Sequence, residues 1–203
     1  MENLSEIITK IEQLLDEKEQ IRNIAIKNSH LITKYARMII HGLITRTFDN
    51  KILINIKTEV MNLKSLLAEH PDLYTTPYIE SALREYAESM FLLSILNREK
   101  KIPTYSELGI TITPYILGLA DTIGELRRVA LECLNKNNYD DAEYYSKTME
   151  KIYIEIMRLD YPNSILSIRQ KQDWARSLIE RTRSDMLYAK CRVQGSGLKE
   201  QSP

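Results

Sequence analysis

Residues 4–39 read LSEIITKIEQLLDEKEQIRNIAIKNSHLITKYARMI, and apolar side chains recur through this stretch at intervals of three or four residues. That spacing places them on one face of an amphipathic helix. No proline occurs in residues 1–70, so one very long helix, or two nearly continuous ones, can reach the break expected at Arg46–Asn50. The stretch therefore predicts a helical protein.

The rest of the chain continues the helical pattern. The pairs Thr76-Pro77 and Thr113-Pro114 each resemble an N-cap followed by proline at the first helical position. We predict an all-α bundle of six to seven long helices, forming a single domain over residues 1–192 with a flexible tail over 193–203. After the first stretch, helices are expected at about 50–69, 76–97, 113–138, 140–160 and 163–189, with one short helical turn at 105–108.

Composition excludes several classes of protein. The chain has 203 residues, 28 Lys+Arg against 28 Asp+Glu, and only six glycines and six prolines, which argues against low complexity and against a many-stranded β-fold. Its two cysteines are not in a Cys-x-x-Cys pair, so no disulfide framework or zinc knuckle is indicated. No apolar stretch approaches the roughly 18 to 20 residues needed to span a bilayer. The acidic start is unlike a signal peptide, so a cytoplasmic protein without a membrane partner is expected.

Charge is unevenly distributed although the formal net charge is zero. Residues 163–203 contain eight basic and four acidic side chains, a local charge of +4. Such groups either contact phosphates or form ordinary solvated helix faces. A second basic group lies in the first long helix and consists of Arg22, Lys27, Lys34, Arg37 and Arg46.

Two acidic pairs stand out on the central helices. Glu85 and Glu88 are at i and i+3 on a helix whose second half is apolar nearly all round, and this pattern marks a buried helix. Asp121 and Glu125 are at i and i+4 on the next long helix. That acidic face also carries Gly118 and Gly124, and glycine inside a helix costs about 1 kcal/mol against alanine, so two of them on one face indicate a close approach by another group.

Four carboxylates from two helices can gather around a hard divalent cation such as Mg²⁺, with Mn²⁺ as a substitute. The competing interpretation is that both pairs are solvated or ion-paired helix residues. No Gly-rich phosphate loop, HExxH motif, EF-hand loop or Glu-x-x-His motif supports another metal or phosphate site. An all-α nucleotide pyrophosphohydrolase also uses Glu-x-x-Glu, but its second motif, Glu-x-x-Asp, does not match Asp121-x-x-x-Glu125.

The run YILGLADTIGELRR at 115–128, following ALREYAES at 82–89, resembles the translin superfamily and is most similar to its translin-associated factor X (Trax) branch. Residues 19–23 and the last helix, 164–192, are also similar. The resemblance implies a seven-helix all-α fold assembled into a hollow shell, commonly of eight subunits, with RNA or single-stranded DNA held largely inside. In the Trax branch a carboxylate cluster binds Mg²⁺ and cleaves RNA internally.

The family's acidic positions fall on Glu85, Glu88, Asp121 and Glu125. The translin subunit itself lacks the acidic pair on the earlier helix, so its presence here favours the catalytic branch. The sequence departs from translin at 74–80, where YTTPYIE contains no basic residue. Nucleic-acid contacts must then come from elsewhere, and the candidates are Arg128, Arg127, Arg37 and Lys34.

The sequence thus predicts a Mg²⁺-dependent endoribonuclease that cleaves single-stranded or unpaired RNA inside a homo-oligomeric shell. All four carboxylates would ligate the metal, and Glu125 or Glu88 could instead orient the attacking water. The alternative is a non-catalytic RNA or single-stranded DNA-binding scaffold. The natural RNA, the number of subunits, the number of metal ions and the need for a second translin-type subunit stay open at this point.

Overall fold

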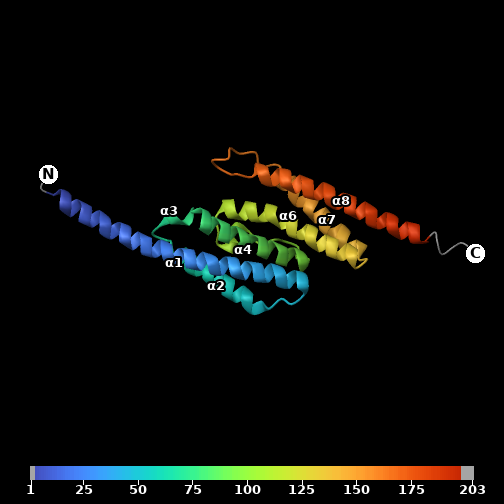
Figure 1. Cartoon of the computed structure of the whole chain (residues 1–203), viewed down its shortest axis with the longest axis horizontal. Coiled ribbons are helices and arrows are strands. Elements are labelled where there is room, and N and C mark those ends of the chain that lie inside the picture. Colours follow the sequence, from blue (N-terminus) through green and yellow to red (C-terminus); the bar gives the residue numbers. More distant parts are fainter. Residues whose placement is uncertain (1–2, 198–203) are drawn as a thin grey trace, which may run out of the picture. The chain divides into compact units, whose positions relative to one another are not determined.

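The computed structural model describes residues 3–197, and every regular element within this range is an α-helix (Figure 1). The predicted all-α class is confirmed, with six long helices and two single-turn helices among the described residues. In chain order the elements are α1 (Leu4–Thr45), α2 (Asn50–Leu66), α3 (Pro71–Tyr74), α4 (Pro77–Leu96), α5 (Tyr105–Leu108), α6 (Ile112–Asn135), α7 (Tyr139–Ile156) and α8 (Arg169–Gly197).

The helices form two compact units. The first unit runs through Met90 and adds Pro103–Pro114, so it contains α1, α2, α3, α5 and most of α4. The second unit contains Phe91–Ile102 and the chain from Tyr115 onward, and therefore most of α6 together with α7 and α8. Helix α4 is continuous across the change of unit at Met90. Glu85 and Glu88 belong to the first unit, and Asp121 and Glu125 belong to the second.

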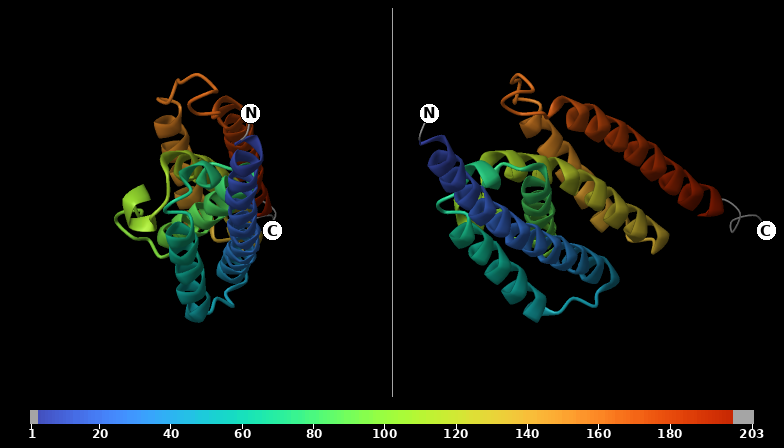
Figure 2. Two further views of the ribbon diagram at one scale, coloured as in Figure 1. Left: turned by 90° about the vertical axis from the view of Figure 1, so that its left-hand side faces the viewer. Right: turned by 60° about the vertical axis from the view of Figure 1, so that its left-hand side comes forward.

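In the first unit, α1 and α2 lie side by side as an antiparallel pair (Figure 2). The sequence allowed either one or two helices over the first stretch, and the structure has one of 42 residues. It ends where the break was expected, because Arg46 adopts the left-handed conformation with φ 59°. Asp49 then caps α2 by accepting a hydrogen bond from the Lys51 backbone N–H at 2.9 Å.

The connections before and after α4 differ in how well the sequence predicts them. The turn α3 was not expected as a separate helix. The turn α5 was expected, and a reciprocal capping box between Thr104 and Glu107 stabilises it. Gly109 ends this turn at φ 69°, a conformation that glycine adopts without steric cost.

In the second unit, α7 packs on α8. The expected start of the last helix at 163–164 is wrong, because α8 begins at Arg169. Pro162 is followed by a turn in which its carbonyl accepts hydrogen bonds from the N–H groups of Ile165 and Leu166, at 2.8 and 3.0 Å. Gln172 then holds this segment through hydrogen bonds to the carbonyls of Ile156 and Leu159.

The end of α8 also differs from expectation. The helical backbone continues to Gly197, beyond the Arg192 boundary at which the tail was expected to begin. Residues 198–203 of that tail lie outside the described residues. Across the described part of the chain, no helix combines the length and apolar character that crossing a membrane requires.

Candidate metal and nucleic-acid site

The first acidic pair lies on a largely buried stretch of α4, as the sequence predicted. Tyr86 and Ala87, between the two glutamates, expose 2% and 0% of their surface. Burial also raises the pKa of the Tyr86 hydroxyl to about 12, because an apolar environment disfavours the phenolate. Glu85 and Glu88 are intermediate in exposure, at the edge of this buried surface.

An arginine on α1 neutralises Glu85. The Arg37 guanidinium donates two hydrogen bonds, from Nε to Glu85 Oε2 and from Nη2 to Glu85 Oε1, both at 2.9 Å. The Arg37 side chain is 71% exposed, whereas the Glu85 side chain is only 18% exposed. A bidentate pair of this kind satisfies both carboxylate oxygens and fixes their orientation.

The second acidic pair lies on α6, where Asp121 and Glu125 are one helical turn apart. The Lys171 ammonium group of α8 contacts Asp121 Oδ1. Only 13% of the Asp121 side chain is exposed, and Lys171 exposes 31%. A cationic group therefore already lies at the carboxylate where a metal ion is predicted.

Glu125 differs from its neighbour because its carboxylate is poorly compensated. Its Oε2 is buried and accepts no hydrogen bond from the residues that the structure describes. Its ion-pair partner is Arg128, whose Nη1 is 3.7 Å from that oxygen. Burial raises the pKa of the Glu125 carboxyl, and the positive charge of Arg128 opposes this shift only in part.

Gly124 lies between the two acids and is in close contact with α8. A Cβ placed on Gly124 would be 2.6 Å from Cη2 of Trp174, closer than real side chains approach one another. The predicted close approach at this glycine is confirmed. The Trp174 ring is 42% exposed, and the Lys171 Nζ lies 5.5 Å from its centroid.

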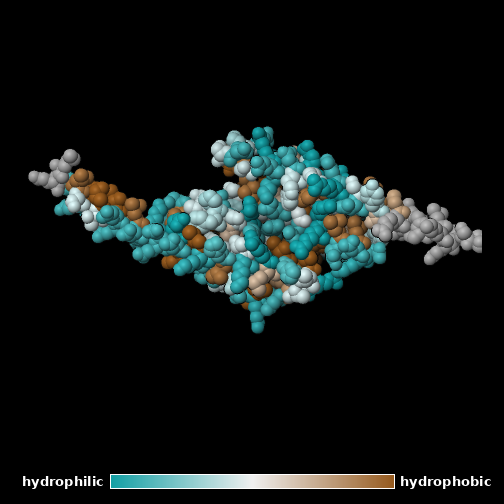
Figure 3. All heavy atoms as spheres, in the orientation of Figure 1, coloured by the Kyte–Doolittle hydropathy of each residue, from teal (hydrophilic) through white to brown (hydrophobic). Residues whose placement is uncertain are grey.

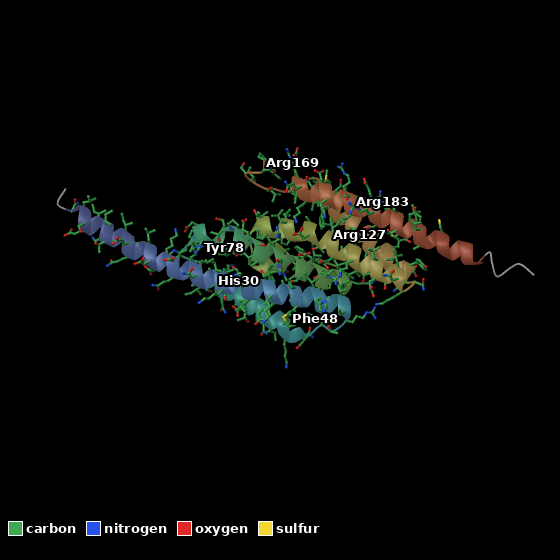
Figure 4. The ribbon with its side chains drawn as sticks, viewed as in Figure 1. His30, Phe48, Tyr78, Arg127, Arg169 and Arg183 are labelled. Atoms are coloured by element: carbon green, nitrogen blue, oxygen red, sulfur yellow. The ribbon has the colours of Figure 1, made fainter. Side chains whose placement is uncertain are left out.

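The predicted nucleic-acid contacts have different environments. Arg127 is part of the α6–α8 packing (Figure 4), because its guanidinium donates to Thr182 Oγ1 and Asp185 Oδ2, each at 2.8 Å. These bonds favour a structural role for Arg127. Arg128 is 56% exposed beside Glu125, and Lys34 is exposed on α1.

The four predicted ligands are thus described as two pairs, one in each unit. Among residues 3–197, no group of three or more His, Cys, Asp or Glu side chains is arranged to hold a metal ion. The four-carboxylate metal site stays a prediction.

Sequence reasoning did not assign a role at this site to Lys171 or Trp174. Both are 46 or more residues from Asp121 and Glu125 in the sequence, and only the basic character of the last helix gave a signal. A groove of about 640 Å³ in the first unit was also unforeseen. Its lining comes from three separate segments and includes Lys64, Tyr74 and Tyr105.

The fold and the two acidic pairs define a class: an all-α protein with paired carboxylates on two consecutive long helices. A family model described as the translin family matches residues 2–189. The chain belongs to the translin family. The uncharacterized protein MJ0175 of Methanocaldococcus jannaschii is 34% identical over 177 residues, which cover 85% of this chain and 78% of that protein.

Solved structures support the same fold. The apo-NeC3PO crystal structure has a TM-score of 0.79 at 20% identity, covering 90% of this chain and 96% of that one. AfC3PO has a TM-score of 0.75 at 27% identity, covering 91% and 97%. A complex of AfC3PO with duplex RNA has a TM-score of 0.74 at 26% identity, with the same coverage.

Proposed function

We propose that this protein is a Mg²⁺-dependent endoribonuclease of the Trax type that acts on unpaired RNA within a homo-oligomer. The observation that carries the proposal is the Glu125 carboxylate, whose buried Oε2 accepts no hydrogen bond from the described residues and has Arg128 Nη1 only at 3.7 Å. A buried carboxylate without a compensating donor is costly, and a bound cation would remove that cost. Its neighbour Asp121 supplies a second carboxylate one turn away.

The chemistry of these donors fits Mg²⁺, which binds carboxylate oxygens and keeps several waters. Asp121 and Glu125 of α6 would hold the ion, with Glu85 and Glu88 of α4 as the further ligands that the family resemblance implies. When bound, the ion supplies a Lewis acid that stabilises negative charge on a phosphate oxygen. Mn²⁺ would substitute because it prefers similar ligands.

The surrounding residues would bind and orient the RNA. Arg128 places an exposed guanidinium beside Glu125, where it can bind a phosphate. The Lys171 ammonium would be released from Asp121 when a metal ion binds there, and would then also be available to a phosphate. Trp174 offers an exposed ring on which an unpaired base can stack.

The relatives support nucleic-acid binding, which is a more general function than RNA cleavage. AfC3PO, at 26% identity, has been solved in complex with duplex RNA. On that likeness we extend RNA binding to this chain. Binding of single-stranded DNA and assembly into a shell of eight subunits are proposed from the family resemblance.

The test is cleavage of labelled RNA by the purified protein. Single-stranded and duplex RNA of one sequence are incubated with Mg²⁺, with Mn²⁺ and with excess EDTA. We expect internal products from the single strand with either metal and none with EDTA. Cleavage that persists in EDTA would refute metal dependence.

Glu125→Gln and Glu132→Gln provide a matched pair of variants on α6. Glu132 is half-exposed and pairs with Lys136 at 2.7 Å, away from Asp121. We expect Glu125→Gln to reduce cleavage at least a hundredfold and Glu132→Gln to leave it unchanged. Equal activity in both variants would remove Glu125 from the mechanism.

One observation favours a second function, RNA binding without cleavage. The bidentate Arg37–Glu85 pair satisfies this carboxylate inside the protein, so Glu85 does not need a metal ion. A scaffold of this kind would shift labelled RNA in a gel and give no products at any Mg²⁺ or Mn²⁺ concentration.

A further inference from the structure

The first turns of α1 carry an exposed apolar face. Six large apolar side chains between residues 4 and 15 each expose between 44% and 66% of their surface. Figure 3 shows this region as a brown patch near the start of α1. The six are Leu4, Ile7, Ile8, Ile11, Leu14 and Leu15, and we call them the N-terminal stripe.

The N-terminal stripe continues the face that α1 buries further along. In a heptad lettered abcdefg with Leu4 at a, the stripe occupies positions a, d and e. Later a positions, Ala25, Ile32 and Ile39, are fully buried. Apart from Lys18, the a positions are therefore apolar as far as Ile39, and the first two of them are uncovered.

The covering elements of the first unit end near Lys18. The Lys18 ammonium pairs with Asp72 of α3 at 2.6 Å. Every residue from Asn3 to Glu17 is exposed. Apolar surface in water costs about 25 cal/mol per Å², so covering the N-terminal stripe would be favourable.

We propose that the N-terminal stripe pairs with the same stripe of a second copy of this chain, in antiparallel orientation. If Ile11 lies opposite Leu14 of the second copy, the a and d positions alternate across the contact. The e positions Ile8 and Leu15 of the second copy then flank this layer on one side, about two residues apart in level. The contact is symmetric, as a two-fold interface between identical chains requires.

Charge complementarity favours the second copy and the antiparallel direction. Lys10 and Glu17 occupy the g positions that flank the stripe. In the antiparallel register each Lys10 flanks the contact on the same side as Glu17 of the second copy, about two residues apart in level and within reach of the long side chains, so two ion pairs form. A parallel pair would place Lys10 beside Leu15 instead, which leaves the ammonium without a partner.

This inference rests on the self-association in the proposed function, but it does not depend on catalysis. None of the predicted metal ligands belongs to the N-terminal stripe. Failure of RNA cleavage would leave the contact intact, and failure of the contact would leave the carboxylate chemistry untouched.

Cysteine cross-linking tests the register. Cys133→Ser and Cys191→Ser first remove the two native thiols. Two differently tagged chains, one with Ile11→Cys and one with Leu14→Cys, are then co-expressed and mildly oxidised. We expect a disulfide-linked heterodimer from the mixture and no covalent dimer from either variant alone. A covalent dimer from a single variant would overturn the antiparallel register, and no cross-link in any sample would overturn the contact.

A charge exchange tests the same contact without cysteines. Lys10→Glu brings four acidic groups together across the pair, and we expect about a tenfold weaker association by light scattering at low salt. Lys10→Glu combined with Glu17→Lys should restore it. Glu12→Lys changes a charge on the outer b position and serves as the control. Failure of the double exchange to restore association would overturn the proposed pairing, and circular dichroism would show that each variant is folded.

Discussion

The ammonium group of Lys171 contacts Asp121 across the packed helices α8 and α6. The two residues are 50 positions apart in the sequence. Asp121 is a predicted metal ligand, so the lysine and a metal ion would compete for the same carboxylate. The contact would therefore link the proposed metal affinity to a side chain that the sequence did not single out.

Replacing this lysine should strengthen metal binding. In Lys171→Met, Asp121 loses its cationic neighbour, and a divalent ion no longer has to displace it. We expect the Mg²⁺ concentration for half-maximal stabilisation to fall about threefold to tenfold, a change of roughly 1 kcal/mol. Thermal unfolding at a series of Mg²⁺ concentrations without RNA measures this directly.

Lys136→Met is the matched control, because Lys136 forms an exposed i,i+4 pair with Glu132 on the same helix. It should leave the Mg²⁺ response unchanged. A parallel change in both lysine variants would mean that bulk charge, and not the Asp121 contact, sets metal affinity.

Glu125 should make stability depend on pH. Burial raises the folded-state pKa of Glu125 above its ordinary 4.5, so the folded protein holds this proton more tightly than the unfolded chain. The destabilisation caused by ionised, buried Glu125 is absent below pH 4.5. It grows as the pH rises from 4.5 to the raised folded-state pKa, and it is complete above that pKa. In EDTA, Glu125→Gln should therefore gain Tm relative to the parent at pH 8 and gain nothing at pH 4.

The same comparison with Mg²⁺ present should reverse the order. The ion stabilises the parent by binding the ionised carboxylate, whereas glutamine offers a weaker ligand. A Tm difference between Glu125→Gln and the parent that stays constant from pH 4 to pH 8 would contradict the assigned burial effect.

Gly124 should be intolerant of even one methyl group. Alanine normally stabilises a helix interior by about 1 kcal/mol against glycine. Here the added Cβ would lie 2.6 Å from the Trp174 ring, and displacing the ring costs about 1–3 kcal/mol. We expect Gly124→Ala to lower stability by about 1 kcal/mol and to shift the fluorescence of Trp174, the only tryptophan in the chain.

Gly124→Ala combined with Trp174→Leu provides the check. The smaller side chain removes the steric conflict, so alanine should then regain its helical advantage. Additive effects in this double-mutant cycle would show that the two residues do not interact.

The sequence predicted those features that depend on local chemistry. Periodicity located the long helices, and the left-handed Arg46 and the N-cap Asp49 lie within the expected break. The buried character of α4 around Tyr86 followed from its apolar composition. The glycine at 124 indicated a close neighbour, although not which residue it would be.

Features that depend on long-range contacts escaped prediction. The spacing of Glu85 gives no sign of Arg37, which is 48 residues away on another helix. The start of α8 was misplaced because Asn163 resembles an N-cap, whereas the carbonyl of Pro162 accepts the following N–H groups in a turn. Periodicity placed the apolar side chains of the first turns of α1 on one helix face, and it could not show that the covering elements end near Lys18.

Arg127 and Arg128 are neighbours in sequence, and their substitution should have opposite consequences. Arg127→Met loses the hydrogen bonds to Thr182 and Asp185, so we expect a loss of about 2 kcal/mol in the free energy of unfolding with little change in RNA affinity. Arg128→Met removes an exposed guanidinium, so stability should hold while RNA binding weakens and the slope of log affinity against log salt falls by about 0.7. Urea unfolding and a salt series of RNA titrations measure the two effects. If Arg127→Met lowered the salt slope instead, the arginine would bind phosphate and its structural assignment would be wrong.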